Sequence, residues 1–334
     1  MPVLSYVHHL FNTEQCHAYI HTRRWKDRPR QCLRCQSPAV DPWGNSHSRP
    51  GCKRSWCNGC KRTFNDLTDT LLPQSQRSLP YWMLATCLRC LACSSRRIAR
   101  ELGVHTRTSY RWCGWLRHAA LSYEMQRPLE GTVEADALDH TAGHKGQAKH
   151  GGKKHLGHRA RGRRQKREPG RGHDDKARPA MIAWGSRQGA VVIQATTDFT
   201  VKTVQKAADL AVQAGSRLYT DSASSYRALK GYVHDYVNHT KKEYARGEVH
   251  ENRAECLFSL LKPYLRVFRG LSKYNLPGYV GFFQFLCNFR QLTAFEQAEM
   301  ILYAALDPAV ASRARRGDFV RCLDHFDLLQ TTRN

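Results

Sequence analysis

The sequence contains no long apolar segment. Its most apolar stretch, residues 279–289, is interrupted by Gln284 and Asn288, whereas a membrane-spanning helix needs roughly 20 apolar residues in a row. Residues 1–15 also lack the basic segment and apolar core that mark a signal peptide. We therefore expect no membrane association and a cytoplasmic location.

Acidic residues are scarce, which leaves a strong positive charge. Only 28 Asp and Glu oppose 53 Lys and Arg, so the formal net charge is +25. Such an excess predicts a polyanionic partner, most simply nucleic acid, and a place with the nucleoid. The 334 residues, 41% of them hydrophobic, are enough for two or three folded domains and argue against global disorder.

The 13 cysteines form an odd number in a long chain, which favours a reducing compartment and thiols that bind metal or fill a core. Two C-x-x-C pairs about twenty residues apart have the spacing of a structural zinc site, and their members are Cys32, Cys35, Cys57 and Cys60. Gly59 precedes the last of them, where a turn needs a permissive residue. Cys52 is a rival ligand without a partner at this spacing. We expect an N-terminal segment over 1–28 and a zinc ribbon with one zinc ion over 29–72.

Residues 78–122 predict a helix-turn-helix. Ile98, Ala99 and Leu102 share one face of a first helix, Gly103 gives a short turn, and a second amphipathic run follows with Thr106 as its N-cap. An ordinary pair of antiparallel helices is the alternative. Arginines on the second helix favour DNA binding, and the residues expected on or near its exposed side are Arg107, Thr108, Tyr110, Arg111 and Arg117.

From residue 130 the pattern changes to α/β. Alternation and turn residues predict strands over 132–138, 180–186, 190–197, 217–220 and 233–239, with a helix over 200–215 that Gly215 ends. Three strands in succession followed by alternating helix and strand suggest a ribonuclease H-like domain, a mixed sheet flanked by helices. We expect this domain to span residues 130–305 and a C-terminal tail to span 306–334.

Three carboxylates stand where elements of this domain begin or end. Asp136 and Asp221 lie at strand ends, and Glu255 lies near the start of a late amphipathic helix. Each has a structural alternative, since Asp221 suits a helix cap, Asp136 a solvated turn, and Glu255 a capping box with Asn252. Together they suit two Mg²⁺ ions, or Mn²⁺, which take oxygen ligands and promote phosphoryl displacement. Lys262 follows Glu255 by seven residues and returns to the same helical face.

Several motifs occur together in this chain beside the cysteine ribbon: "RIARELGVHTRTSYRW", "TVEADA", "YTDSASSY", "VNHTKKEYARGEVHENRAECLFSLLK" and "GYVGFFQFLCNFR". Through them, over roughly residues 30–290, the chain resembles the DDE insertion-sequence transposases of family fifteen-ninety-five, the ISXO-like group, which have an N-terminal zinc ribbon. The resemblance implies that Asp136, Asp221 and Glu255 bind the metal ions and that Lys262 contacts DNA near the scissile phosphate. It also implies supporting roles for His239, His250 and Asn252.

The chain departs from this family at two places. Ala137 stands where the family has an acidic residue, so Asp139, and more weakly Glu134, remain alternatives to Asp136 as the first ligand. Pro263 follows Lys262 and would remove a hydrogen bond to Ser259 and kink the helix.

Residues 140–178 form a basic insertion of net charge +10, from 13 Lys and Arg against 3 Asp and Glu. Rich in glycine and poor in apolar residues, it predicts a mobile loop without a core. Since it follows Asp136, we expect it to lie along DNA at the active site, although a solvated insertion without a role is the alternative. The cations expected to contact DNA are Lys153, Lys154, Arg163 and Arg164.

The sequence therefore predicts a bacterial DNA transposase. The ribbon and the helix-turn-helix would bind the terminal inverted repeats of its element, and the metal site would hydrolyse a phosphodiester and transfer the strand to target DNA. Holding two DNA ends implies a dimer or a larger homo-oligomer. The alternatives are an inactive DNA-binding regulator, a nuclease of the same fold without strand transfer, and an IS-one-type relative with a different third ligand.

Overall fold

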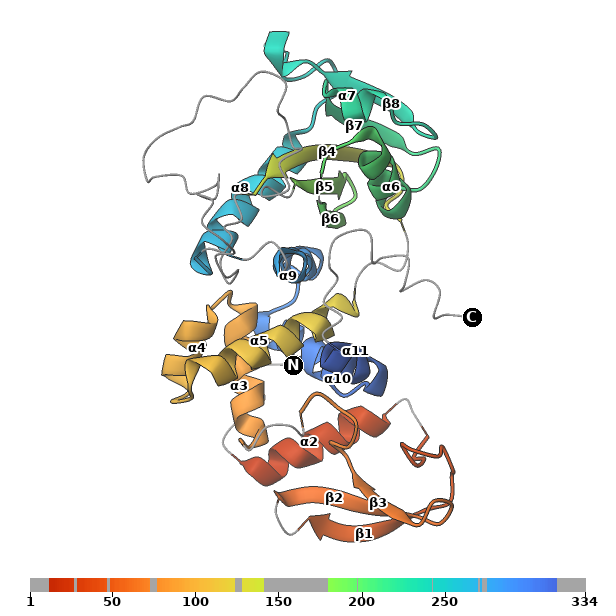
Figure 1. Ribbon diagram of the computed structural model, residues 1–334, viewed down its shortest axis with the longest axis vertical. Helices are drawn as coiled ribbons and strands as arrows, with labels where there is room; N and C mark the ends of the chain where they lie inside the picture. The colour runs from red at the N-terminus through yellow and green to blue at the C-terminus, as the bar shows by residue number, and fades with distance from the viewer. Residues whose placement is uncertain are drawn as a thin grey trace, which may run out of the picture. The chain divides into compact units, whose positions relative to one another are not determined.

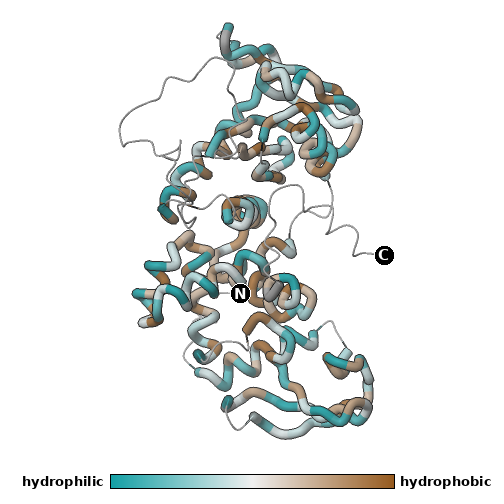
Figure 2. The backbone as a smooth tube through the Cα atoms, viewed as in Figure 1, coloured by the Kyte–Doolittle hydropathy of each residue, from teal (hydrophilic) through white to brown (hydrophobic). Residues whose placement is uncertain are grey.

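The computed structural model describes residues 12–26, 29–46, 49–72, 77–123, 128–140, 180–196, 198–241, 243–269, 271 and 275–316. Two compact units make up the chain (Figure 1): Met1–Ser122 with Phe289–Asp318, and Tyr123–Asn288 with Phe319–Asn334. Along the helices of both units, hydrophobic and hydrophilic residues alternate (Figure 2), as expected for elements with one buried face. Within the described residues, no helix combines the length and apolar character needed to cross a membrane.

The first unit begins with one helix and a small antiparallel sheet of order β1-β2-β3. Asp66, just after β3, fixes this helix, because it accepts a hydrogen bond from Trp25 Nε1 at 2.8 Å and lies 3.0 Å from His21 Nδ1. The elements are α2 (Thr13–Trp25), β1 (Val40–Ser46), β2 (Arg49–Cys57) and β3 (Arg62–Asn65). Residues expected to form only an N-terminal segment therefore form a helix that packs on the sheet.

The rest of the first unit is helical, and its helices are α3 (Leu79–Cys90), α4 (Ser95–Glu101), α5 (Thr106–Leu121), α10 (Ala294–Ala305) and α11 (Pro308–Arg316). Helices α3, α5 and α10 pack together, with Trp82 and Trp112 at a ring-centroid distance of 4.7 Å. Helix α10 was expected in the α/β domain. It lies in the first unit instead, because it packs against α3 and α5, with its Ile301 and Leu302 buried.

Helices α4 and α5 are joined by a tight turn at Gly103, whose φ is +60°. Ile98 and Leu102 are buried, as the sequence predicts. The N-cap of α5 is His105, whose Nδ1 accepts a hydrogen bond from the Arg107 N–H at 3.2 Å, so Thr106 is the first helical residue. The prediction for Arg117 is wrong: it is only 2% exposed, because residues 116–120 of α5 are all buried within the unit.

The second unit contains a mixed five-stranded sheet of order β6-β5-β4-β7-β8. Strands β4, β5 and β6 pair antiparallel, whereas β7 is parallel to both β4 and β8. The mixed sheet and its five strands were predicted to within two residues at each end. Their bounds are β4 (Thr132–Asp139), β5 (Ala180–Ser186), β6 (Val191–Thr196), β7 (Arg217–Asp221) and β8 (Val233–Val237).

Helices cover both faces of this sheet. Val133 and Ala135 of β4 pack on Val204 of α6 (Val201–Ala211) in one core cluster. Side chains alternate along a strand, so Glu134 and Asp136 face the other side, where α8 (Asn252–Val267) packs on β4 and β5. The predicted helix stop is wrong: α6 ends at Ala211 because Val212 is already extended, and Gly215 forms the turn into β7.

The remaining elements of the second unit are α7 (Ser224–Arg227), a short 3₁₀ helix (His239–Lys241) and α9 (Leu276–Asn288). Helix α9 closes the open edge of β6 through two side chains. Gln284 Oε1 accepts a hydrogen bond from the Ile193 N–H at 2.8 Å, and Asn288 Oδ1 accepts one from the Val191 N–H at 2.8 Å. The two polar interruptions of the apolar run thus satisfy backbone groups that the edge strand leaves unpaired.

Candidate functional site

The ends of two parallel strands lie beside β4 at one edge of the five-stranded sheet. The prediction that Asp136 stands at a strand end is wrong, because β4 continues past it to Asp139 in pairing with β5. The register pairs Glu134 with Tyr219 on the parallel strands β4 and β7, so two residues later Asp136 is level with Asp221. On the next parallel strand, Val237 pairs with Asp221, and His239 follows two residues further on. Because the carboxyl ends of parallel strands share an edge, the sheet places these two carboxylates and the imidazole near one another.

Helix α8 adds two carboxylates to this edge. Glu251 immediately precedes the helix, and Glu255 lies one turn into it. A nitrogen of His239 and one carboxylate oxygen each from Glu251 and Glu255 lie within 4.8 Å of one another. Nε2 of His239 also contacts Oε1 of Glu251 directly. Glu251 is buried, whereas Glu255 is exposed to solvent.

The electrostatics link the strand carboxylates to those of the helix. Burial raises the pKa of Asp136 to about 6, and the negative charges of Asp221 and Glu255 contribute to the rise. Burial also raises the pKa of Glu251 to about 7, with contributions from Asp136 and Asp221. The four carboxylates therefore repel one another, and a bound cation would relieve that repulsion.

Glu134 fixes the position of α8 over the sheet. This carboxylate is 1% exposed. Its Oε2 accepts a hydrogen bond from the Arg253 N–H at 2.8 Å, and its Oε1 accepts one from Arg187 Nε at 2.9 Å. The capping box of Asn252 and Glu255, named from the sequence as a structural alternative, is not formed. The N-cap is Glu251 without a side-chain cap, and Glu134 of β4 caps the first turn instead.

These contacts bear on the two alternative ligands named from the sequence. Both oxygens of Glu134 are engaged by groups of the protein itself. Asp139 is three residues from Asp136 on the same strand, so alternation directs it to the opposite face of the sheet. Asp136 is therefore the strand carboxylate that shares the site with Asp221.

The other predicted site residues lie around this centre. His250 belongs to the Glu134 network, with its Nδ1 3.3 Å from Glu134 Oε1 and its Nε2 3.0 Å from the Arg187 guanidinium. Asn252 is exposed at the first residue of α8. Lys262 is exposed on the same face as Glu255, about 10 Å further along the helix axis. The helix continues through Pro263 to Val267.

The sequence interpretation missed Glu251. It stands four residues before Glu255, the spacing that puts two side chains on one helical face, so a signal was present. Apart from the buried Arg117, the residues predicted on the exposed side of α5 are accessible: Arg107, Tyr110 and Arg111 are exposed, and Thr108 is half-buried. Lys153, Lys154, Arg163 and Arg164, and the rest of the insertion after His140, lie outside the described residues.

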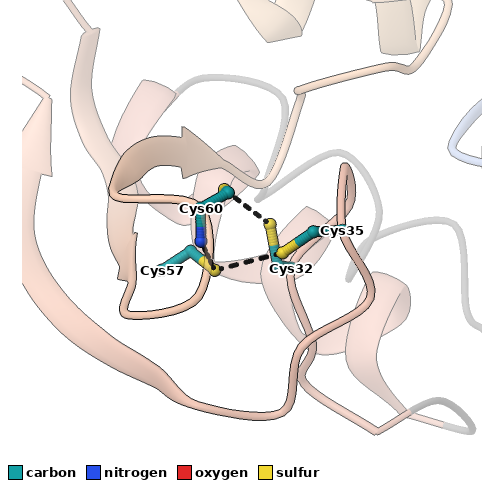
Figure 3. Close-up of side chains that lie close together, drawn as sticks. All are labelled: Cys32, Cys35, Cys57 and Cys60. Atoms are coloured by element: carbon teal, nitrogen blue, oxygen red, sulfur yellow. Dashed lines mark hydrogen bonds between the residues drawn. The ribbon is translucent and has the colours of Figure 1, made fainter.

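The four predicted cysteines form a second cluster, in the first unit (Figure 3). Sγ of Cys32 lies 3.6 Å from Sγ of Cys60, and Sγ of Cys35 lies 3.5 Å from Sγ of Cys57. A tetrahedral zinc ion with bonds of about 2.3 Å separates its sulfur ligands by about 3.8 Å, so the cluster is compatible with a zinc ribbon. The rival Cys52 is buried outside it, and burial raises the pKa of that thiol to about 11.

The local chemistry of the cluster suits a cation. Burial opposes ionisation of Cys32. Hydrogen bonds from the backbone N–H groups of Cys35 and Arg34, together with those from the thiols of Cys57 and Cys35, outweigh it and lower the pKa of Cys32 to about 6. Gly59 is needed for space and not for its φ, because an added Cβ would meet the Ser37 side chain at 3.0 Å and Cys35 Sγ at 3.5 Å. Lys61 takes the positive φ of this turn, at +53°.

Comparison with known proteins gives the family. The family model described as "ISXO2-like transposase domain" matches residues 128–288. A protein of Halobacterium salinarum described as "Uncharacterized protein in transposable element ISH50" is 30% identical over 292 residues, which span 85% of this chain and 93% of that protein. The chain belongs to the ISXO2-like transposase family. The resemblance inferred from the sequence is thereby confirmed.

The transposase match contains every strand of the mixed sheet and every carboxylate of the site at its edge, and it ends where α9 ends. The relative from the transposable element extends the similarity over most of the remaining chain. No solved structure gave a significant match.

We predict that Glu134→Gln lowers the free energy of unfolding by about 2 to 3 kcal/mol, because it leaves Arg187 and the first turn of α8 without a buried anion. Urea denaturation of the full chain measures this. Glu130→Gln changes an exposed carboxylate just before the same strand and should shift stability by less than about 0.5 kcal/mol. Equal stability of the two variants would contradict the role given to Glu134.

We also predict that the purified chain carries one zinc ion and that Cys35→Ser loses it, because three thiolates bind zinc more weakly than four. Elemental analysis by mass spectrometry measures the metal content. Cys93→Ser, which changes a half-buried cysteine outside the cluster, should retain the ion. Zinc-free wild-type protein would contradict the prediction.

Proposed function

We propose that this member of the transposase family is an active DDE enzyme that cuts DNA at the ends of its element and joins the freed strand to a target. The observation that carries the proposal is the gathering of Asp136, Asp221, Glu251 and Glu255 at one sheet edge, where the pKa values of Asp136 and Glu251 are raised. Within a family of DNA-transposing proteins, such a cluster suits phosphodiester chemistry with divalent cations.

The donor set supports magnesium, with manganese as a substitute. Hard divalent cations take carboxylate oxygens and retain several waters, and the buried Glu251 leaves one oxygen without a hydrogen-bond partner in the described residues. Asp136, Asp221 and Glu255 would hold two ions. When bound, such ions polarise the scissile phosphate and lower the pKa of the attacking hydroxyl.

The remaining tasks fall to side chains of the chain itself. Lys262 is exposed on the Glu255 face of α8, so its ammonium group can reach a phosphate beside the carboxylates and hold the DNA strand in register. Glu134 and Arg187 would keep the first turn of α8 fixed during the reaction. His239, in contact with Glu251, would orient that carboxylate.

The arrangement of the second unit supports a ribonuclease H-like domain. Its first three strands form an antiparallel meander, and the next two are added in parallel on the far side of the first strand. This topology leaves Asp136 of the central strand β4 beside the end of β7, where metal-binding carboxylates can meet. Helix α8 then supplies the third ligand from one face.

The first unit supplies the proposed DNA-binding elements. Helices α4 and α5 with the turn at Gly103 suit a helix-turn-helix, and Arg107, Tyr110 and Arg111 are exposed on the second helix. The cysteine-centred sheet exposes further cations at Lys53, Lys61 and Arg62. We propose that these surfaces bind the terminal repeats and that the basic insertion contacts DNA near the active site. Two ends held together would require a dimer or a larger homo-oligomer.

Replacement of Asp221 by Asn should lower cleavage of DNA carrying the element's own ends by about 10³-fold or more, because a metal ligand is removed. Binding of the same DNA should be unchanged. A gel assay of the DNA flanking the gene, with Mg²⁺ or Mn²⁺, measures both.

The same assay separates the alternatives. A wild-type protein that binds these ends but never cuts them is a regulator. A protein that cuts them but never joins pre-cleaved ends to target DNA is a nuclease. If Glu255→Gln leaves activity intact, the third ligand lies elsewhere, as in an IS-one-type relative.

Double replacement of Arg107 and Arg111 by Ala should weaken binding to the end DNA and flatten its salt dependence. The slope of log K against log salt changes by about 0.9 for each phosphate that the protein no longer neutralises, so we expect a change of about 2 units. Fluorescence anisotropy between low and moderate salt measures the slope. Lys202→Ala changes an exposed cation on α6 and should leave the slope unaltered. A wild-type slope in the double variant would show that these α5 arginines do not contact DNA.

A further inference from the structure

We propose that Glu251 is a fourth metal ligand of the active site, binding through Oε2 while His239 holds Oε1. This deepens the proposed function and rests on it. The three carboxylates named from the sequence do not include this residue, and its place beside Glu255 was found only in the folded chain.

The first support is the burial of an incompletely paired anion. Glu251 is 2% exposed, and burying a carboxylate is costly unless its oxygens are paired or coordinate a metal. Oε1 contacts Nε2 of His239. Oε2 is buried and has no hydrogen-bond partner within the described part of the chain. One oxygen is therefore held in place, and the other is available to a ligand.

The second support is the group of ligand atoms around the Glu251 carboxylate. Ligand atoms of Glu251, Glu255 and His239 lie within 4.8 Å of one another, and Asp136 and Asp221 are close enough for their charges to act on Glu251. His239 lowers the pKa of Glu251 through its hydrogen bond and its charge, but burial and the charges of Asp136 and Asp221 outweigh it. Mutual repulsion of this kind is expected where a divalent cation completes the site.

The spacing suits a shared ion. Two oxygens that each bind Mg²⁺ at about 2.1 Å lie at most about 4.2 Å apart, so a small movement of the exposed Glu255 side chain brings it into coordination with Glu251. The two glutamates are four residues apart, and Glu251 O accepts the Glu255 N–H at 3.1 Å at the start of α8. The two side chains thus leave the backbone at the start of α8, Glu251 at the N-cap and Glu255 in the first turn.

The competing explanation is purely structural: the contact between Glu251 and His239 would tie α8 to the end of β8. If the contact is only structural, Glu251→Gln should make the metal-free protein less stable and should not change its metal affinity. A ligand gives the opposite pattern, since Gln removes a buried negative charge from a crowded site and offers a poorer donor to the cation.

The test is a titration of the full chain with Mn²⁺ in the absence of DNA. Calorimetry measures the affinity, and the rise in melting temperature gives a second readout of binding. Glu251→Gln should weaken binding of one ion at least tenfold and leave the melting temperature without metal unchanged or higher. Glu248→Gln, whose carboxylate is 80% exposed nearby, should match the wild type. Wild-type Mn²⁺ affinity in Glu251→Gln, or a drop in its metal-free melting temperature with no change in affinity, would overturn the proposal.

Two further variants keep the result unambiguous. If Glu251→Gln fails to fold, Glu251→Asp retains the charge on a side chain one methylene shorter; it should bind Mn²⁺ more weakly than the wild type, and equal affinity would overturn the proposal. Asp221→Asn tests the proposed site itself. If it weakens Mn²⁺ binding and Glu251→Gln does not, only the fourth ligand is wrong. If neither does, the metal-dependent function fails as well.

Discussion

The candidate site depends on one buried carboxylate, Glu134, which is not itself a proposed metal ligand. Glu134 sits two residues before Asp136 on the central strand and accepts hydrogen bonds from the first turn of α8 and from Arg187. A helix start needs acceptors for its free N–H groups, and here the acceptor comes from the sheet. The same strand therefore carries one proposed ligand, Asp136, and fixes the start of the helix that carries another, Glu255, so these hydrogen bonds set the distance between strand and helix.

That arrangement explains how a repulsive cluster can persist in a folded protein. The stabilising contacts lie next to the cluster. Glu134 pairs with Arg187 and with the α8 backbone. On the opposite face of the sheet, Val133, Ala135 and Val204 belong to an apolar cluster. Burial and crowding raise the pKa values of Asp136 and Glu251, so keeping these carboxylates charged costs stability. Under the proposed function, a bound cation would offset that cost.

The sequence was enough to predict the strands, the cysteine cluster and the residues whose spacing is local. Period-two alternation gave the two faces of β4, and the paired C-x-x-C spacing brought four sulfurs together. Contacts that depend on distant residues could not be read in this way. The cap on α8 comes from a residue 119 positions earlier, and Arg117 is polar by composition but buried by packing. Glu251 was within reach through its spacing to Glu255, but its burial was not.

Charge is distributed over the chain in a way that suits a metal-dependent DNA enzyme. The whole sequence carries +25, yet four carboxylates are concentrated at one sheet edge. DNA attracted by the exposed cations would meet a negative field at the point where its phosphate has to react. Divalent cations bound there would cancel that field and supply the positive charge that the phosphate requires. Under the proposed function, metal binding is thus a condition for close approach of the substrate as well as for the chemistry, and a fourth carboxylate makes that condition stricter.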